Sequence, residues 1–520
     1  MTDPIEPLEA SHGKVEAAGR AQAAPREFAD LVMPWATPTA SAVGAVPVTG
    51  VCLDSRLVRA GDLYVALPGT RAHGADFAAK AVAAGAAGIL TDAEGAERLG
   101  GDVGVPVAVA ADLRGAMARI AADLYAEPTD SLRMFGVTGT NGKTTTTFLL
   151  AAALRGLGLR VGSIGTLGFE LDSEPLRVAR TTVTTPESVD LQALLALMRD
   201  LGAQAVAMEV SSHAMVQRRT EPVRFDVAAF TNLSPEHLDF HPDMEHYFEA
   251  KAALFSPDHC RAAVVNIDDE AGARLAERIR GTDVELRTVS WREPADYRIT
   301  EVSGRHVRLA SGLEFDLLLP GDFNVTNAVT ALAMIELAGL DRAAAAGALG
   351  TVTVPGRMQP VDLPSGAPTA FVDFAHTPEA VRSALAVFGR DRTRGRRVIA
   401  VLGCGGDRDR VKREPMGRVA AEGADIVVVT DDNPRSEDPA AIRARVLAGA
   451  RSVTDDPARV IDGGERRAAI GLALRTAGVN DVVVVLGKGH EQGQEIRGRV
   501  VPFDDASVIV EEWRAAEGDR

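Results

Sequence analysis

Apolar and polar positions form a repeating pattern along most of this 520-residue chain. Short apolar runs that suit buried strands alternate with longer segments that suit helices. The clearest of these runs are at residues 203–210, 224–233, 261–270, 396–403, 425–431 and 481–487. Strands that alternate with helices are typical of a parallel sheet covered by helices. The pattern therefore predicts an α/β fold.

Breaks in this pattern divide the chain into four segments. Residues 1–28 are rich in Ala, Glu and Pro and lack periodicity, so we expect a mobile extension without chemistry. A small α/β domain is predicted over 29–130, and a larger one over 131–355. Prolines and glycines then interrupt the pattern at 353–366, which predicts a third α/β domain over 356–520. Three domains also suit a chain of this length, because single cores rarely grow beyond about 250 residues.

The segment LRMFGVTGTNGKTTTTFLL, residues 132–150, predicts a site for a nucleoside triphosphate. Its glycines permit positive φ, so that backbone amides and the start of the following helix can face phosphate oxygens. Lys143 would neutralise the β and γ phosphates, and Thr144 would place its hydroxyl on magnesium. The usual P-loop has its first glycine where this chain has Val137, so the loop here is two residues tighter. The alternative is an ordinary strand, turn and helix with a chance Gly-Lys pair.

Polar residues cluster where the predicted strands of the second domain end. They are Glu209, Ser211, Thr231, Asn232 and Asn266. Ligands of open α/β sheets bind at the carboxyl ends of the strands, so we expect these side chains to face the phosphate loop. Glu209 could reach a magnesium ion held by nucleotide phosphates. Taken alone, such a carboxylate is as often a solvated surface group.

His237 and Lys251 are further candidates in this domain. His237 lies in a loop that follows a strand end, although a lone loop histidine is more often structural. Lys251 lies on a helix whose apolar positions Phe248, Ala252 and Phe255 follow helical spacing. By itself this helical pattern favours a solvated lysine.

Composition narrows the possible partners. The net charge of −16 disfavours nucleic acid or an anionic membrane as the main partner. Cys52, Cys260 and Cys404 are far apart in the sequence, which predicts neither a disulfide framework nor a zinc site. No leader-like start and no apolar run near the ~20 residues of a membrane span is present, so we expect a cytoplasmic protein without membrane insertion.

Seven longer motifs follow one another along the chain, namely GTNGKTTT, EVSSH, TNLSPEHLDFH, HYFEAKAALF, GDFNVTNA, PGRM and DFAHTPEA. Together and in this order they resemble the Mur ligase family of peptidoglycan synthesis. Members of this family share the shortened phosphate loop. DSR with GDLYVALPG, GCGGDRDRVKREPMG, DDNPRSEDP and GKGHEQGQ resemble the tripeptide-forming branch of the family. The resemblance covers everything except the N-terminal extension.

The resemblance implies an ATP-dependent amide ligase with three domains. The N-terminal domain would bind the UDP end of the substrate, the central P-loop domain would be the ATPase, and a C-terminal Rossmann-like domain would bind the incoming amino acid. The substrates would be UDP-MurNAc-L-Ala-D-Glu, meso-diaminopimelate and ATP, joined through an acyl phosphate. We expect the protein to act as a monomer.

The resemblance also assigns the site residues. Lys143, Glu209, His237 and Lys251 would be catalytic, and Thr144, Glu209, His237 and Lys251 would hold magnesium, with Lys251 carried as a carbamate made from carbon dioxide. The ATP site would comprise Gly139, Thr140, Asn141, Gly142, Lys143, Thr144, Thr145, Asn327, Arg357 and Asp373. The UDP-MurNAc-dipeptide site would comprise Leu53, Ser55, Thr70, Arg71, Ala72, Thr184, Thr185, Ser211, Gln217 and Arg219, with Arg218 as the alternative to its neighbour. The diaminopimelate site would comprise Arg408, Asp432, Asn433, Pro434, Arg435, Gly487 and Glu491.

Arg435 distinguishes between amino-acid substrates in this reading. Its planar guanidinium can hold the far carboxylate of diaminopimelate by two hydrogen bonds, and lysine has no such carboxylate. Glu491 would suit the distal ammonium group. Members of the family that add lysine depart from the DNPR pattern at residues 432–435.

Other functions fit the sequence less well. Folylpolyglutamate synthetase or a lysine-adding relative would belong to the same class, but the DNPR pattern disfavours both. A nucleotide-dependent switch would leave the third domain without a role, and the guanine-selective NKxD motif is absent after the loop. A dehydrogenase is disfavoured because GCGG, residues 403–406, is followed by Arg408 where the GxGxxG fingerprint needs glycine.

Overall fold

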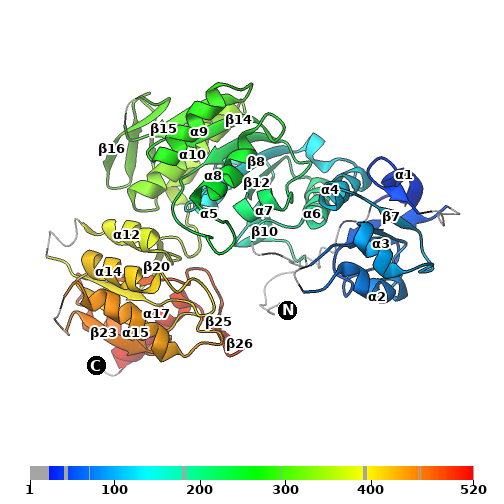
Figure 1. Ribbon diagram of the computed structural model, residues 1–520. Helices are drawn as coiled ribbons and strands as arrows, with labels where there is room; N and C mark the ends of the chain where they lie inside the picture. Colours follow the sequence, from blue (N-terminus) through cyan, green and yellow to red (C-terminus); the bar gives the residue numbers. More distant parts are fainter. Residues whose placement is uncertain are drawn as a thin grey trace.

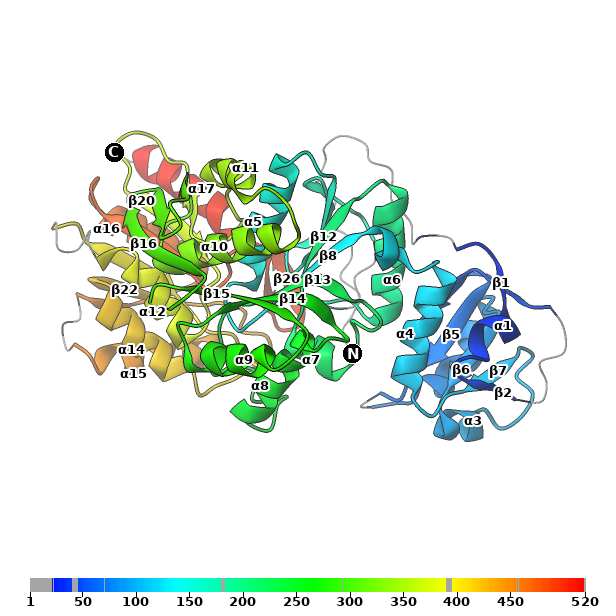
Figure 2. The same ribbon diagram turned by 90° about the horizontal axis from the view of Figure 1, so that it is seen from above.

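The computed structural model describes residues 21, 23–39, 45–69, 71–178, 182, 184–292, 294–389, 395–454, 456 and 458–518. It arranges them in three α/β units that follow one another in space as in the sequence (Figure 1, Figure 2). Thr70 and residues 1–20 of the expected extension lie outside the described residues. The predicted α/β class with three domains is confirmed.

The N-terminal unit contains a five-stranded sheet with the order β2-β7-β6-β5-β4. Its strands are β2 (Thr37–Pro38), β4 (Gly50–Cys52), β5 (Asp62–Ala66), β6 (Gly88–Thr91) and β7 (Val107–Val109), and only the edge strand β2 is antiparallel. Its helices are α1 (Phe28–Val32), α2 (Ala78–Ala83), α3 (Ala93–Leu99) and α4 (Leu113–Leu124). β1 (Arg26–Glu27) pairs with β3 (Pro47–Val48), so the folded unit begins before residue 29.

The central unit contains an eleven-stranded sheet with the order β11-β10-β9-β12-β8-β13-β14-β15-β16-β17-β18. In this sheet order, β9, β16 and all the strands between them are parallel to one another. These strands are β8 (Arg133–Thr138), β9 (Val161–Gly165), β12 (Ala205–Glu209), β13 (Phe225–Phe230), β14 (Cys260–Asn266), β15 (Glu285–Ser290) and β16 (Tyr297–Ser303). The edge strands β10 (Gly168–Leu171), β11 (Glu174–Pro175), β17 (His306–Leu309) and β18 (Glu314–Asp316) are antiparallel. The sheet is therefore mixed, because tight turns, such as the one at Gly304 with φ +61°, let the edge strands fold back.

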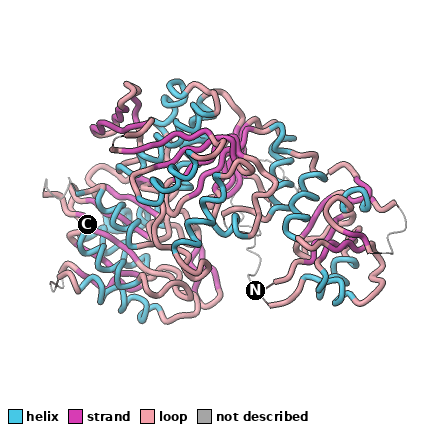
Figure 3. Tube along the Cα trace, turned by 45° about the horizontal axis from the view of Figure 1, so that its top comes forward, coloured by secondary structure: helices cyan, strands magenta, loops and turns pink. Residues whose placement is uncertain are grey.

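Helices cover both faces of the central sheet (Figure 3). α5 (Lys143–Gly156), α10 (Asp322–Leu337) and α11 (Arg342–Ala346) contribute to the apolar core on one face. α6 (Ser188–Asp200), α8 (Met244–Ala252) and α9 (Glu270–Arg280) contribute to the core on the other face, and α7 (Ser212–Val216) follows β12. Because β8 lies between β12 and β13, the carboxyl ends of these three strands meet at one edge of the sheet.

The C-terminal unit contains a six-stranded sheet with the order β19-β20-β24-β21-β22-β23. Its strands are β19 (Gln359–Val361), β20 (Thr369–Asp373), β21 (Val398–Leu402), β22 (Ile426–Thr430), β23 (Val460–Gly464) and β24 (Val482–Leu486), of which only β19 is antiparallel. α12 (Pro378–Ala386), α14 (Arg413–Gly423) and α15 (Pro439–Arg451) cover one face, and α16 (Arg466–Thr476) and α17 (Asp505–Gly518) cover the other. A separate hairpin of β25 (Gly493–Ile496) and β26 (Arg499–Pro502) follows β24.

In the part of the chain that the structure describes, no helix is both long and apolar enough to cross a membrane.

Candidate active site

The phosphate loop connects β8 to α5 and is held by the end of β13. Gly139 and Gly142 have φ values of +147° and +88°, which favour glycine. A Cβ atom on Gly139 would lie 1.9 Å from Thr231 Oγ1, so the contact with β13 also requires glycine. The Thr140 amide donates to the Asn232 carbonyl over 2.9 Å, and the Asn141 amide donates to Asn232 Oδ1 over 2.9 Å. These contacts hold the loop against the end of β13.

Lys143, the first residue of α5, lies against the same loop. Its Nζ donates to the carbonyl oxygens of Gly139 (2.9 Å) and Thr140 (2.8 Å). Burial lowers the pKa of Lys143, and the nearby carboxylates of Glu236 and Glu209 oppose that shift. The side chain is thus placed beside the amides that would surround phosphate oxygens.

Glu209 lies at the end of β12, and its carboxylate faces the start of α5. It is 1% exposed, and its Oε1 accepts hydrogen bonds from Thr144 Oγ1 (3.0 Å) and from the Thr166 amide (2.8 Å). Oxygen ligands of this kind are those that Mg²⁺ prefers. Within the described ranges, no group of three or more His, Cys, Asp and Glu side chains is arranged to hold a metal ion.

Lys251 is buried in the structure, whereas its helical pattern alone favoured a solvated position. The residue is 1% exposed, and its Nζ donates to the Gly139 carbonyl over 2.7 Å. The same nitrogen lies 4.5 Å from the centre of the Tyr247 ring. The pKa of Lys251 lies well below its ordinary value, mainly because the amine is buried and also because the positive charge of Lys143 is nearby. The two lysines thus share the Gly139 carbonyl as an acceptor.

His237 lies in the loop after β13, next to a carboxylate that the sequence did not single out. Its backbone has a φ of +57°, and its Nε2 lies 3.7 Å from Glu236 Oε2. Burial lowers the pKa of His237, although Glu236 opposes the shift. Glu236 Oε1 also lies 3.3 Å from His376 Nε2 in the C-terminal unit. Burial would raise the pKa of Glu236, but its hydrogen bond with His376 and the nearby cations lower it overall.

Arg357, at the start of the C-terminal unit, reaches the phosphate loop. Its Nη2 donates to Thr144 Oγ1 over 3.2 Å, and its guanidinium carbon lies 4.3 Å from the centre of the Phe374 ring. Asn327, on α10, lies against the loop, because a Cβ atom on Gly142 would be 2.6 Å from its Oδ1. Asp373 instead accepts hydrogen bonds from the backbone amides of Met358 (2.6 Å) and Ala375 (2.8 Å). It therefore fixes the chain next to Arg357.

Five of the residues expected to bind the UDP substrate gather beyond β12; they are Thr184, Thr185, Ser211, Gln217 and Arg219. The Thr185 hydroxyl donates to the Glu209 carbonyl over 3.0 Å, and the Ser211 amide donates to that hydroxyl over 3.1 Å. Arg219 donates to the Thr185 carbonyl (3.1 Å) and to Gln217 Oε1 (2.6 Å). Arg218 points elsewhere and pairs with Asp112 and Glu221. The structure therefore places Arg219 rather than its neighbour in this cluster.

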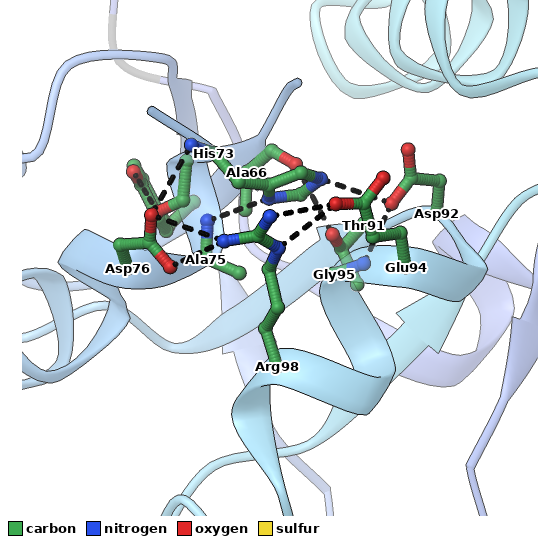
Figure 4. A network of polar contacts seen from close by, with 11 residues as sticks. Ala66, His73, Ala75, Asp76, Thr91, Asp92, Glu94, Gly95 and Arg98 are labelled. Carbon is green, nitrogen blue, oxygen red and sulfur yellow. Dashed lines mark hydrogen bonds and ion pairs between the residues drawn. The ribbon is translucent and has the colours of Figure 1, made fainter. Parts of the chain in front are cut away.

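The other expected UDP residues, Leu53, Ser55, Arg71 and Ala72, lie in the N-terminal unit. His73, which was not predicted, directly follows Ala72 and caps the short 3-10 helix η1 (Gly74–Phe77) (Figure 4). Its Nδ1 accepts from the Ala75 amide over 3.0 Å, and its Nε2 lies 3.1 Å from Asp92 Oδ1. An Nδ1 that accepts leaves the proton on Nε2, so the ring donates to Asp92. This buried ring thus joins η1 to the start of α3.

Arg435 lies after β22 and is held by two other segments of the C-terminal unit. Its Nε donates to Glu495 Oε2 over 3.0 Å, and its Nη1 donates to the Gly406 carbonyl over 2.7 Å. The side chain is 23% exposed. Arg408, on the same loop as Gly406, is exposed. The guanidinium expected to recognise a carboxylate is therefore fixed in place, whereas Arg408 extends to the surface.

Asn433 connects the remaining residues expected to bind diaminopimelate. Its Nδ2 donates to Glu491 Oε2 over 2.8 Å, and its Oδ1 accepts from Lys488 Nζ over 3.2 Å. Lys488, which is fully buried and was not predicted, also donates to Glu491 Oε2 over 2.7 Å. A Cβ atom on Gly487 would lie 2.7 Å from Asp432 Oδ2, so glycine is required where these loops meet. Glu491 therefore already has a cationic partner within the protein.

Glu437 links the loop after β21 to α14 beside Arg435. Its Oε1 accepts from the Asp407 amide (2.7 Å) and from Arg413 Nη2 (2.8 Å). The hydrogen bond from Arg413 and the one from the Asp407 amide lower the pKa of Glu437 to about 2. A carboxylate whose pKa is lower in the folded than in the unfolded state stabilises the fold at pH values above its unfolded-state pKa. This stabilisation disappears as the pH falls towards its folded-state pKa.

We therefore expect Glu437→Gln to lower the melting temperature at pH 7, by an amount that shrinks below about pH 4.5. The measurement is thermal unfolding of the two proteins from pH 7 to pH 3. A difference that stays constant with pH would contradict this role for the Glu437 charge.

A cavity of about 580 Å³ lies away from these residues. It is lined by residues of the N-terminal unit, such as Trp35 and Arg119, and by residues at the amino ends of β8, β13 and β14, including Arg133, Arg224 and Arg261. The phosphate loop lies at the opposite, carboxyl ends of these strands. The cavity is therefore separate from the candidate active site.

The phosphate loop, its two lysines and the arginine from the neighbouring unit define a P-loop protein of three α/β units. Three family profiles match the chain: the catalytic domain of the Mur ligase family at residues 47–125, the Mur ligase middle domain at 137–335, and the Mur ligase glutamate ligase domain at 356–489. A UDP-N-acetylmuramoyl-L-alanyl-D-glutamate--2,6-diaminopimelate ligase of Streptomyces coelicolor is 47% identical over 489 residues, covering 91% of this chain and 94% of the relative. The ligase of the same name from Corynebacterium glutamicum is 44% identical over 496 residues, covering 92% of this chain and 93% of the relative.

Solved structures agree with these relatives. A UDP-N-acetylmuramoyl-L-alanyl-D-glutamate--2,6-diaminopimelate ligase structure has 30% identity and a TM-score of 0.66, covering 95% of this chain and all of the other. The MurF ligase of Thermotoga maritima in complex with ADP shares the fold at 19% identity and a TM-score of 0.60, covering 91% of this chain and 98% of the other. The chain belongs to the Mur ligase family. Within that family it falls in the MurE branch, as the sequence motifs predicted.

Proposed function

We propose that this chain joins an amino group of meso-diaminopimelate to the D-glutamyl carboxylate of UDP-MurNAc-L-Ala-D-Glu while ATP becomes ADP and phosphate. The observation that carries the proposal is the 47% identity to a ligase of this name over 91% of the chain, because it includes all three units. The reaction would belong to peptidoglycan precursor synthesis.

The arrangement around the phosphate loop suits activation of a carboxylate. A carboxylate is a poor electrophile at neutral pH, so transfer of the γ-phosphoryl group to it creates an acyl phosphate with a good leaving group. The amine then attacks the acyl carbon, and the tetrahedral intermediate collapses to an amide and phosphate. Lys143 and the loop amides would hold the phosphates in line and offset their charge, which is the main task in phosphoryl transfer.

Thr144 and Glu209 fit a magnesium site, because the hydroxyl and the buried carboxylate lie 3.0 Å apart beside the loop. A magnesium ion bound there would neutralise phosphate charge as it develops. His237 and a modified Lys251 are proposed as further ligands near the loop.

Lys251 is suited to carbamylation. Its buried amine has a pKa well below the ordinary value, so the uncharged form that reacts with carbon dioxide is available. In the carbamate a bond joins Nζ to the carbon of carbon dioxide, one proton leaves, and the group becomes an anion. The anion would lie near the Lys143 ammonium, because both lysines contact the Gly139 carbonyl, and the two opposite charges would attract each other.

Arg435 supports diaminopimelate as the amino acid that is added. A half-buried guanidinium can bind the far carboxylate of diaminopimelate, whereas the far end of lysine carries only an ammonium group, which the guanidinium repels. We further propose that the protein acts as a monomer in the cytoplasm.

The proposal is tested by phosphate release from ATP in the presence of UDP-MurNAc-L-Ala-D-Glu. We expect release with meso-diaminopimelate that exceeds release with L-lysine by at least about 100-fold in kcat/KM, since a site built for hydrogen bonds rejects ligands that lack them. Omission of the UDP substrate is the control. Equal turnover of both amino acids would contradict the assigned specificity, and no release with either would contradict the function.

A further inference from the structure

Glu495 lies outside the assigned site but forms an ion pair with Arg435, the residue expected to select the amino acid. It lies in β25, in the hairpin after β24, sixty positions beyond Arg435. Its side chain is 41% exposed, and its Oε2 accepts from Arg435 Nε over 3.0 Å. A carboxylate beside the arginine that should bind the ligand's carboxylate needs a physical explanation.

The hairpin holds the backbone of Arg435 as well as its side chain. The Arg435 amide donates to the Glu495 carbonyl over 3.0 Å, and the Arg497 amide donates to the Arg435 carbonyl over 2.7 Å. Arg435 has a φ of +50°, in the left-handed region that non-glycine residues seldom adopt. The two backbone hydrogen bonds stabilise this conformation, so the hairpin determines where the arginine side chain begins.

The side-chain contacts leave part of the guanidinium available. Among the contacts that the structure describes, Glu495 uses the Nε–H group and the Gly406 carbonyl uses one N–H group on Nη1. The second N–H of Nη1 and both of Nη2 therefore remain for a ligand, which is enough for two hydrogen bonds to one carboxylate. Glu495 and Gly406 thus restrict the rotation of the guanidinium without using it up.

We propose that Glu495 is a positioning residue that selects a dicarboxylic amino-acid substrate by fixing the guanidinium of Arg435. This inference rests on the proposed function, because it assigns Arg435 to the far carboxylate of diaminopimelate. Glu495 does not touch the substrate and acts through Arg435. Its removal frees the torsions of a long side chain, and binding must then order that side chain again.

The experiment compares Glu495→Ala and Glu495→Gln with the wild type in steady-state assays that vary each of the three substrates in turn. We expect Glu495→Ala to raise KM for diaminopimelate roughly fivefold to tenfold, since this is the usual effect of one side chain that must be immobilised on binding. KM for ATP and for UDP-MurNAc-L-Ala-D-Glu, and kcat, should stay within about twofold. Glu495→Gln should stay close to the wild type, because its amide oxygen can still accept from Arg435 Nε.

Two controls separate positioning from general stability. Glu511→Ala removes another exposed partner of an arginine in the same unit, Arg467, at 2.8 Å, and should change none of the three KM values. In an Arg435→Ala background, Glu495→Ala should have no further effect on KM for diaminopimelate, because Glu495 then has nothing to position.

Several results would overturn the inference. They are an unchanged KM for diaminopimelate in Glu495→Ala, an equal rise in all three KM values, failure of glutamine to restore the wild-type KM, or a full additional effect in the Arg435→Ala background. A wild-type protein that does not turn over diaminopimelate at all would instead contradict the proposed function, and the inference with it.

Discussion

Replacement of Lys251 by alanine is expected to lower the rate of phosphate release by about 10³-fold or more, which is the scale on which loss of preorganised charge at a phosphoryl-transfer site acts. The Lys251 amine lies 2.7 Å from the Gly139 carbonyl inside the phosphate loop, so the lost group lies directly beside the phosphate site. Alanine offers no nitrogen for carbamylation, and high bicarbonate should therefore not restore activity. The measurement is phosphate release with all three substrates at saturation.

A matched control for this variant lies on the same helix. Glu249 is 44% exposed and pairs with Arg278 on α9, away from the loop. Glu249→Ala should remain within about twofold of the wild type, as surface substitutions usually do. Full activity of Lys251→Ala, or its recovery with bicarbonate, would exclude the proposed role of the carbamate.

Replacement of Arg435 by alanine is expected to lower kcat/KM for meso-diaminopimelate by about 100-fold, because two hydrogen bonds to a charged group are lost. L-lysine turnover should change little or rise, since lysine brings no carboxylate to this position. Arg435→Lys should resemble the alanine variant, because an ammonium group cannot form the planar two-bonded contact. The measurement is kcat/KM for each amino acid with the same protein preparations.

The control for Arg435 lies in the hairpin that contacts it. Arg499, in β26, is exposed, and Arg499→Ala should leave the preference for diaminopimelate unchanged. An Arg435→Ala variant that still prefers diaminopimelate over lysine by the wild-type ratio would show that selection resides elsewhere.

The sequence predicted those parts of the molecule that depend on local patterns. Apolar runs followed by helices were enough for the α/β fold and for three units, and the glycines around Thr140 were enough for a phosphate loop. Glu209 was placed near that loop because the carboxyl ends of neighbouring parallel strands meet, and in the structure its carboxylate lies 3.0 Å from Thr144 Oγ1.

Features that depend on long-range packing were not predictable in the same way. The spacing around Lys251 gave no sign that its amine is buried, because its burial depends on the phosphate loop more than one hundred residues earlier. The contact between Glu236 and His376 joins two units, and that between Arg435 and Glu495 joins a turn to a hairpin. The antiparallel edges of the central sheet were also missed, since short edge strands have weak apolar patterns.

The burial of Lys251 is a property that the resemblance between motifs did not predict. HYFEAKAALF identifies the lysine but says nothing of its surroundings, whereas the structure shows an amine that shares its acceptor with Lys143. A buried amine whose pKa lies well below its ordinary value is a chemical reason for modification at this position. The family pattern and the local electrostatics are therefore independent supports for the same proposal.

The division into three units, each with its own main sheet, has an evolutionary consequence. The phosphate loop belongs to the central sheet, Arg435 follows a strand of the C-terminal sheet, and Arg71 belongs to the N-terminal unit. Because each sheet has its own apolar core, substitutions that alter one binding surface need not disturb the packing behind the others. A lineage could thus exchange the amino acid incorporated into its cell wall through changes in a few loops of one unit, while the apparatus for phosphoryl transfer is inherited intact.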